Sequence, residues 1–167
     1  VISDEVYEHF IWKGAHHTSI ASFSDAADRT VTVNSFSKSY AMTGWRIGYA
    51  CGPERVIANM TKLQENIYAC ASSIAQKAAM AALSGGDESL DMMISEYDRR
   101  RDFMEKSLTA LPGISFVNPQ GSFYLFVDVR NYCSTSEDFA KDLLKRKGLA
   151  LIPGSAFGKT GEGFVRI

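Results

Sequence analysis

The sequence predicts an α/β domain followed by a small α+β domain. Three short runs rich in β-branched and aromatic residues lie within residues 1–52, and two segments of helical periodicity come after them. A longer helical segment leads into residues 113–167, where short strand-like runs alternate with one amphipathic helix. We place the boundary inside the long helix, so that residues 1–95 form the first domain and residues 96–167 the second.

The first domain is expected to contain a sheet covered by helices. Its β-rich runs are Val1–Tyr7, Thr30–Phe36 and Trp45–Cys51. Pro53 suits a first helical turn, and apolar residues recur at helical spacing from Val56 to Leu63. Ser73 and Gln76 have the spacing of a capping box, in which the hydroxyl and the Gln bond the first free backbone N–H groups. This pattern predicts the start of an Ala-rich helix.

The second domain is expected to begin within the longest helix. Asp87 can cap this helix and Pro112 stops it. A shorter helix is predicted over Ser134–Gly148, because Ser134 and Glu137 form a second capping box. The predicted strands are Ser115–Asn118, Ser122–Val129, Leu149–Ile152 and Phe164–Ile167.

Both ends of the chain predict that it is truncated. Val1–Tyr7 begins at once as a strand, and no initiator Met precedes it. At the other end, Phe164–Ile167 stops on a strand without a closing turn or helix. We therefore expect a piece of a longer protein, with part of the first sheet missing.

The composition is typical of a soluble globular protein and argues against several functions. The 167 residues are 46% hydrophobic and 22% charged, with a net charge of -1. This charge gives no reason to expect nucleic acid or an anionic membrane as a partner, and no apolar run reaches the length of a membrane span. No metal site is predicted, because His16-His17 stands as an isolated pair. The three scattered cysteines fit a reducing cytoplasm.

A lysine among serines and aromatic residues is the most informative feature of the sequence. Lys38 directly follows a β-rich run, at the carboxyl end of a predicted strand, where α/β proteins bind ligands. A primary amine there can form a Schiff base with an aldehyde cofactor, while nearby hydroxyls and Arg46 can hold a phosphate. Taken alone, Lys38 would more often be an ordinary lysine of a surface loop.

Two residues near the start of the chain add to this interpretation. Asp4 falls in an apolar strand, where a buried carboxylate is costly unless it is paired, and a pyridinium nitrogen is a fitting partner. Tyr7 emerges near the same strand end and can bond the phenolic oxygen of such a ring. The alternative is a solvated Asp at a strand edge beside a Tyr in the core.

Four motifs, in this order, resemble the class I/II aminotransferases of pyridoxal 5'-phosphate (PLP) fold type I. They are Ser3–Tyr7, Ser35–Lys38, Thr43–Tyr49 and Phe164–Ile167. The resemblance covers the whole chain. Within the family, the chain is most similar in character to bacterial and archaeal aspartate or aromatic aminotransferases. It implies that residues 1–95 are the carboxy-terminal part of a large PLP-binding domain with a mostly parallel sheet, and that residues 96–167 are an incomplete small domain. It also implies a cytoplasmic homodimer with its active site at the interface.

The resemblance gives a role to each cofactor-binding residue. Lys38 corresponds to the Schiff-base lysine, whose amine later moves a proton between the substrate α-carbon and the cofactor. Asp4 corresponds to the partner of the pyridine nitrogen, and Tyr7 to the donor that bonds the phenolic oxygen. The expected phosphate ligands are Ser35 and Arg46, with Ser37 as a weaker candidate.

Arg166 corresponds to the residue that binds the substrate α-carboxylate, a task that suits the two parallel N–H donors of a guanidinium. The alternative is an arginine of an edge strand in a surface ion pair. Two further expectations concern packing. Trp45 is expected in the core rather than against the cofactor, and Asp98–Asp102 is expected to form a solvated helix face.

The implied function is transfer of an amino group from an amino acid, aspartate or aromatic, to a 2-oxo acid in a ping-pong cycle. Several cofactor ligands of this family precede the segment that the chain resembles, so the isolated chain is expected to be inactive. Two alternatives stay open: a PLP-dependent C–S or other lyase of the same fold, and a non-catalytic folding or dimerisation module.

Overall fold

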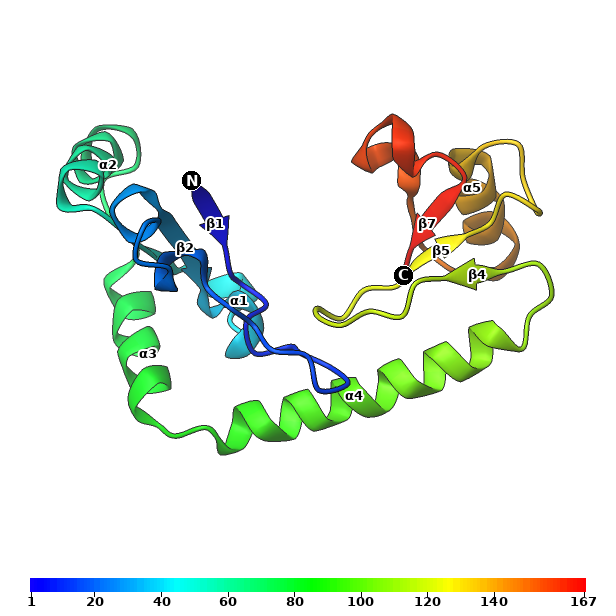
Figure 1. Cartoon of the computed structure of the whole chain (residues 1–167), viewed down its shortest axis with the longest axis horizontal. Helices are drawn as coiled ribbons and strands as arrows, with labels where there is room; N and C mark the ends of the chain where they lie inside the picture. The colour runs from blue at the N-terminus through cyan, green and yellow to red at the C-terminus, as the bar shows by residue number, and fades with distance from the viewer. The chain divides into compact units, whose positions relative to one another are not determined.

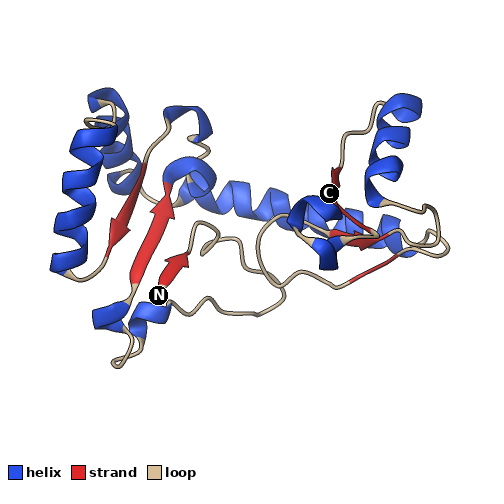
Figure 2. Ribbon diagram, turned by 90° about the horizontal axis from the view of Figure 1, so that it is seen from above, coloured by secondary structure: helices blue, strands red, loops and turns tan.

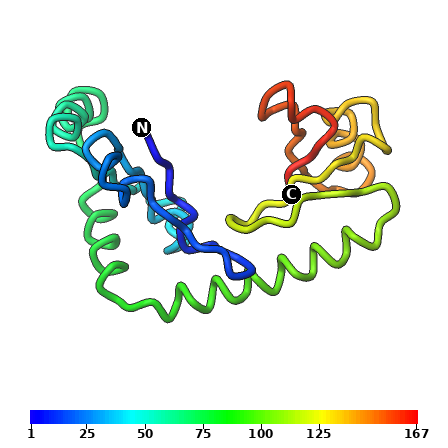
Figure 3. Tube along the Cα trace, viewed as in Figure 1, coloured from blue at the N-terminus to red at the C-terminus, as the bar shows by residue number.

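The computed structural model describes residues 1–167, which divide into two compact units. The first unit is Val1–Ser95 and the second is Glu96–Ile167. The longest helix, α4 (Glu88–Thr109), contains the junction and is traced as one continuous helix in Figure 3. No helix combines the length and the apolar character that a membrane span requires.

The first unit is built on a three-stranded sheet in the order β1-β2-β3. Its strands are β1 (Ile2–Asp4), β2 (Val31–Ser35) and β3 (Gly48–Cys51). β1 runs parallel to β2, whereas β3 is antiparallel to it (Figures 1 and 2). The three predicted runs are confirmed in position, but each is shorter than predicted. The first ends at Asp4, because the chain turns where Glu8 N donates to the carbonyl oxygen of Glu5 at 3.0 Å.

A small apolar cluster anchors the segment that follows β2. Phe36, from the short helix α1 (Phe36–Ser39), is buried together with Met42 and with Ala79 of α3 (Ser73–Ser84). The prediction that Trp45 packs in the core is wrong, since its side chain is 47% exposed. Met42 takes the buried position of this segment, and Trp45 ends the 3₁₀ helix η3 (Thr43–Trp45) on the surface.

Helices α2 (Glu54–Ile67) and α3 follow the sheet and agree with the predicted helical segments. Two 3₁₀ turns, η1 (Ile20–Ser22) and η2 (Ala27–Arg29), come before β2. The capping box predicted at Ser73 is wrong, because Ser73 is already the first helical residue and Ser72 holds the N-cap position. Gln76 Nε2 therefore donates to the carbonyl oxygen of Ala71 at 2.9 Å instead of closing a box.

The second unit is an antiparallel four-stranded sheet in the order β4-β5-β7-β6. Its strands are β4 (Ser115–Phe116), β5 (Phe126–Asp128), β6 (Ile152–Pro153) and β7 (Phe164–Arg166). Short 3₁₀ helices, η4 (Gly154–Phe157) and η5 (Lys159–Gly161), connect β6 to β7. The core contains one residue of α4 and four from the sheet region, namely Leu108, Leu125, Val127, Val129 and Val165. Because β7 lies between β5 and β6 in the strand order, it is an inner strand of this sheet.

The predicted amphipathic helix of the second unit is α5 (Ser136–Lys147). Its capping box is shifted by one residue from the prediction. Thr135 is the N-cap, and its Oγ1 accepts from Asp138 N at 3.1 Å while donating to the Asp138 carboxylate at 2.8 Å. The box of Ser134 and Glu137 is therefore wrong. At the other end, Gly148 adopts the left-handed conformation with φ of 66°.

The charged run in α4 is only partly a solvated face. The side chain of Arg101 is 9% exposed, and its guanidinium lies 2.7 Å from carboxylate oxygens of both Asp98 and Asp102. Arg99 and Arg100, in contrast, are exposed and pair with Glu96. The prediction is therefore wrong for Arg101, which its helical position turns toward the second unit's own interior.

Candidate functional site

The candidate site begins where β2 passes into α1. The N-cap of α1 is Ser35, whose Oγ accepts from Ser37 N at 3.1 Å. This cap closes the tight turn that places Lys38 one turn beyond the end of the strand. The Lys38 side chain is half-buried, and its Nζ lies 5.9 Å from the centre of the Tyr7 ring. Two predicted site residues from separate segments are therefore brought together.

The carboxyl ends of β1 and β2 lie at the same edge of the sheet, because these two strands are parallel. Asp4 is the last residue of β1 and pairs in register with Val33. It is exposed, and its Oδ1 accepts from Val6 N at 3.3 Å. The expectation of a buried carboxylate at Asp4 is therefore wrong for this chain. Glu5 directly follows β1 and its N–H still donates to the carbonyl oxygen of Val33 at 2.9 Å, so its side chain points to the face opposite to that of Asp4.

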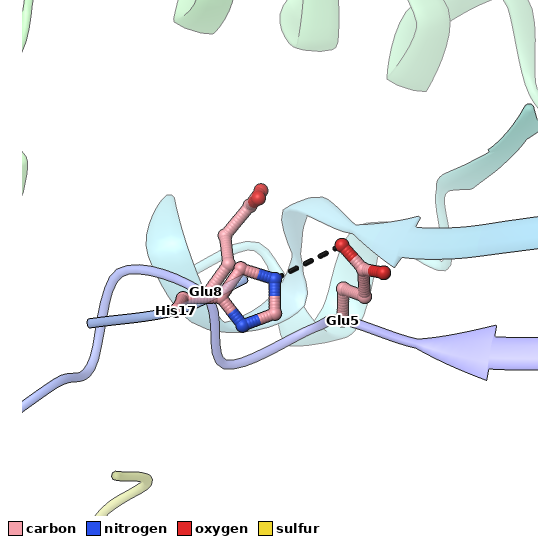
Figure 4. Close-up of side chains that lie close together, drawn as sticks. All are labelled: Glu5, Glu8 and His17. Carbon is pink, nitrogen blue, oxygen red and sulfur yellow. Dashed lines mark hydrogen bonds and ion pairs between the residues drawn. The ribbon is translucent and has the colours of Figure 1, made fainter. Parts of the chain in front are cut away.

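Glu5 is the buried carboxylate, with 5% of its surface exposed, and sequence reasoning missed it. Its Oε1 accepts from the hydroxyls of Ser3 at 2.9 Å and Ser19 at 2.8 Å. Its Oε2 lies 3.0 Å from His17 Nε2 (Figure 4). Burial raises the pKa of Glu5, but the hydrogen bonds with His17, Ser19 and Ser3 outweigh burial, so its pKa is lowered overall. Strand alternation was the one signal that could have found it.

A second carboxylate lies beside this pair. Glu8, Glu5 and His17 each offer a ligand atom, and these atoms lie within 4.8 Å of one another (Figure 4). The expectation that His16-His17 stands isolated is wrong, because His17 contacts Glu5. Glu8 Oε1 also accepts a hydrogen bond from the buried amide of Asn34, on β2. These bonds fix the turn after β1, which carries Tyr7, against β2.

Arg46 and Ser35 lie on adjoining segments at the end of the β2-β3 pair. Ile47, the residue after Arg46, presents a carbonyl oxygen that accepts from Phe36 N at 3.3 Å and from Ser35 Oγ at 3.4 Å. Arg46 has the left-handed φ of 52°, and its Nη1 donates to the carbonyl oxygen of Thr43 at 2.7 Å. Its guanidinium is exposed and offers further N–H donors. Ser35 and Ser37 thus lie in the turn that presents Lys38, and Arg46 lies in the segment whose next residue, Ile47, bonds that turn.

Arg166 belongs to the second unit and is described there by itself. It lies on β7, paired in register with Phe126 of β5 and with Ile152 of β6. The alternative of an edge-strand arginine is therefore wrong. Its guanidinium carbon lies 4.3 Å from the centre of the Tyr124 ring and 4.8 Å from that of Phe157. Both distances are within the usual range of a cation–π contact.

Sequence comparison identifies the family. The chain matches the family described as aminotransferase class I and II over residues 1–167. It is 46% identical over 171 residues to the aspartate aminotransferase of Pyrococcus abyssi, covering 100% of this chain and 43% of that protein. It is 40% identical over 169 residues to aromatic-amino-acid aminotransferase 2 of Thermococcus litoralis, again covering 100% of this chain and 43% of the relative.

Solved structures agree with the sequence relatives. The aromatic aminotransferase of Pyrococcus horikoshii OT3 superposes with a TM-score of 0.93 at 47% identity, over 99% of this chain and 44% of that structure. The chain thus spans less than half the length of the relatives it matches. The resemblance carried by the four motifs is confirmed: the chain belongs to the class I and II aminotransferase family.

Proposed function

We propose that the full-length protein is a PLP-dependent aminotransferase and that Lys38 holds its cofactor. One observation carries this proposal: the Lys38 amine lies 5.9 Å from the Tyr7 ring, at the sheet edge where the parallel strands β1 and β2 both end. A lysine held at such an edge, beside an aromatic hydroxyl, suits an aldehyde cofactor better than it suits a surface-loop role.

The donor set fits the polar groups of PLP. A carboxylate suits the pyridine nitrogen, a phenol suits the ring oxygen, and hydroxyls with a guanidinium suit the phosphate. The residues proposed for these tasks are Asp4, Tyr7, Ser35, Ser37 and Arg46. The exposed guanidinium of Arg46 has donors beyond the one that bonds Thr43, so it retains the capacity for a phosphate.

When bound, PLP supplies an electron sink for the negative charge that develops at the substrate α-carbon. The Asp4 carboxylate then holds a proton on the pyridine nitrogen, and the Tyr7 hydroxyl donates to the ring oxygen. The Lys38 amine takes the proton from the substrate α-carbon and delivers it on the cofactor side, acting as general base and then as general acid. Arg166 binds the α-carboxylate of the amino acid and, in the second half of the ping-pong cycle, that of the 2-oxo acid.

Aspartate is the proposed first substrate and an aromatic amino acid the second, since the relatives carry both names. We assign residues 1–95 to the carboxy-terminal part of the large PLP-binding domain and residues 96–167 to the small domain. We also propose a cytoplasmic homodimer whose active site is completed at the subunit interface. These assignments follow the family.

The test is a reductive trap. The full-length protein is mixed with PLP and reduced with borohydride, and the phosphopyridoxyl group is then mapped by mass spectrometry. The expected result is a single adduct on Lys38, absent from Lys38→Ala and unchanged in Lys77→Ala, which removes an exposed lysine of α3. Adducts spread over surface lysines would contradict the assignment. In unreduced samples of the same proteins, transfer of the amino group from aspartate to a 2-oxo acid is followed, and Lys38→Ala should abolish it.

A further inference from the structure

Two aromatic rings flank the arginine of the second unit, and they come from different parts of the chain. Tyr124 precedes β5, whereas Phe157 ends η4, between β6 and β7. Arg166 itself is on the inner strand β7. The guanidinium carbon lies 4.3 Å from the Tyr124 ring centre and 4.8 Å from the Phe157 ring centre. Because the three side chains come from three separate segments, only the tertiary fold brings them together.

The scaffold beneath Phe157 is tightly packed. Its ring meets that of Phe126 edge to face, with centroids 5.9 Å apart, and Phe126 stacks on Phe164 at 5.1 Å. The 3₁₀ helix that carries Phe157 starts at Gly154, where a Cβ atom would lie 2.7 Å from the carbonyl oxygen of Phe164. The 3₁₀ helix that carries Phe157 therefore packs closely on β7 at Gly154, although the Phe157 side chain is 49% exposed.

A second arginine of the same unit, Arg130, shows by comparison that the N–H donors of Arg166 are left available for a ligand. The guanidinium of Arg130 also lies over a ring, 5.4 Å from the centre of Phe164. However, Arg130 is paired with Asp128, with 3.0 Å between Nε and Oδ1. Its charge and several of its N–H donors are already used. Arg166 forms no such ion pair, and two ring faces flank its guanidinium.

The difference has a chemical consequence. The face of an aromatic ring attracts a cation but accepts no strong hydrogen bond, so it orients the guanidinium and leaves the N–H groups at its edge unused. Those N–H groups form the planar pair of donors that matches a carboxylate. A neighbouring aspartate or glutamate would orient the arginine equally well, but it would compete with the carboxylate of a ligand.

We propose that Tyr124 and Phe157 are positioning residues that hold Arg166 as a receptor for the α-carboxylate of the substrate. This inference rests on the proposed function, in which Arg166 binds that carboxylate. The two rings fix the plane of the guanidinium before the ligand arrives, which lowers the entropic cost of binding. They act through Arg166 and have no part in the proton transfers.

The test is a double-mutant cycle in the PLP-loaded full-length protein. The probe is α-methyl-aspartate, the analogue of the proposed first substrate. It has no α-proton, so it binds without transamination. Its Kd is measured from the absorbance change of the bound cofactor. Phe157→Leu and Tyr124→Leu should each raise Kd roughly 5-fold, as expected for a lost cation–π contact in a partly desolvated site. Tyr124→Phe keeps the ring and should keep the Kd.

The second arm of the cycle separates positioning from a general packing role. In an Arg166→Gln background, the same leucine substitutions should change Kd less than about 2-fold, because no guanidinium remains to be oriented. Phe103→Leu is the matched control, since it removes an exposed ring of α4 and leaves both rings of Arg166 in place. If Phe157→Leu fails to fold, Phe157→Met replaces it, because Met keeps the bulk without the ring.

The outcomes distinguish this inference from the proposed function. Equal effects of the leucine substitutions in both backgrounds would overturn the positioning role while leaving Arg166 as the carboxylate ligand. An Arg166→Gln variant with unchanged Kd would instead show that the proposed function of Arg166 itself is wrong, and the positioning role with it. A 5-fold effect that disappears with the arginine supports both.

Discussion

Glu5 Oε2 and His17 Nε2 lie 3.0 Å apart, although 12 residues separate them in the sequence. The other oxygen of Glu5 accepts hydrogen bonds from Ser3 and Ser19. A buried carboxylate thus joins the end of β1 to the loop before η1. Because Tyr7 follows directly, this network supports the turn that presents one of the proposed cofactor-binding side chains.

Glu5→Gln is predicted to destabilise the full-length protein by roughly 1–3 kcal/mol, because it leaves buried hydrogen-bonding groups incompletely paired. The urea dependence of unfolding measures this change. The control is Asp25→Asn, which breaks the exposed pair with Arg29 and should cost less than about 0.5 kcal/mol. Equal effects of the two substitutions would show that the Glu5 network contributes no more than a surface ion pair.

The same network predicts a pH dependence of stability. The pKa of Glu5 is lowered from its ordinary value of 4.5, so the unfolded chain binds this proton more readily than the folded chain does. The contribution of Glu5 to stability is therefore fully present above the unfolded pKa of 4.5 and is lost as the pH falls through the lower folded pKa. Urea midpoints measured between neutral and acidic pH should fall less steeply for Glu5→Gln than for the natural sequence. Parallel curves would contradict this prediction.

Thr135→Ala is predicted to destabilise the protein by about 1 kcal/mol, since Thr135 Oγ1 caps α5 by accepting from Asp138 N. Ser134→Ala provides a matched comparison, because Ser134 is the neighbouring hydroxyl residue and is exposed outside the helix. It should change the stability by less than about 0.5 kcal/mol. The reverse order of effects, measured by thermal or urea unfolding, would mean that the box of Ser134 and Glu137 forms in solution.

Ser35→Ala is predicted to weaken PLP binding roughly 5-fold by loss of the N-cap of α1, which orients Lys38. The dissociation constant is obtained by titrating the apoprotein with PLP and following the absorbance of the cofactor. Ser84→Ala, at the exposed end of α3, should leave that constant unchanged. An unchanged Kd for Ser35→Ala would mean that neither the cap nor the Ser35 hydroxyl supports the cofactor.

The isolated 167-residue chain is predicted to be inactive and to self-associate. It spans 43% of a relative of the same family, and large apolar side chains of α2 and its end are exposed, including Leu63 at 61%, Ile67 at 75% and Tyr68 at 77%. Size-exclusion chromatography with light scattering measures the association, and a coupled transaminase assay measures the activity. Turnover at an ordinary enzymatic rate by a monomeric 167-residue chain would contradict this prediction.

Much of the fold could be predicted from local patterns. The runs that became β1, β2 and β3 are marked by β-branched and aromatic residues, and the start of α2 is marked by Pro53. Lys38 was identified from its position after a strand in a loop of serines, and the structure places it at the end of β2. Helix boundaries were less predictable. Either hydroxyl of Ser134-Thr135 can cap a helix, and the structure has Thr135 as the N-cap, beside Ser136, which bonds the distant Glu162.

The sequence by itself determined the family, the order of the strands and helices, and the lysine proposed to bind the cofactor, because each depends on residues that are neighbours in the chain. Only the tertiary structure decided that Glu5 rather than Asp4 is buried, that Trp45 is exposed, and that two rings flank Arg166. These features depend on contacts between distant segments, such as the 12-residue separation of Glu5 and His17. No local period or propensity encodes which distant side chain fills a given space, since burial is a property of the packed chain.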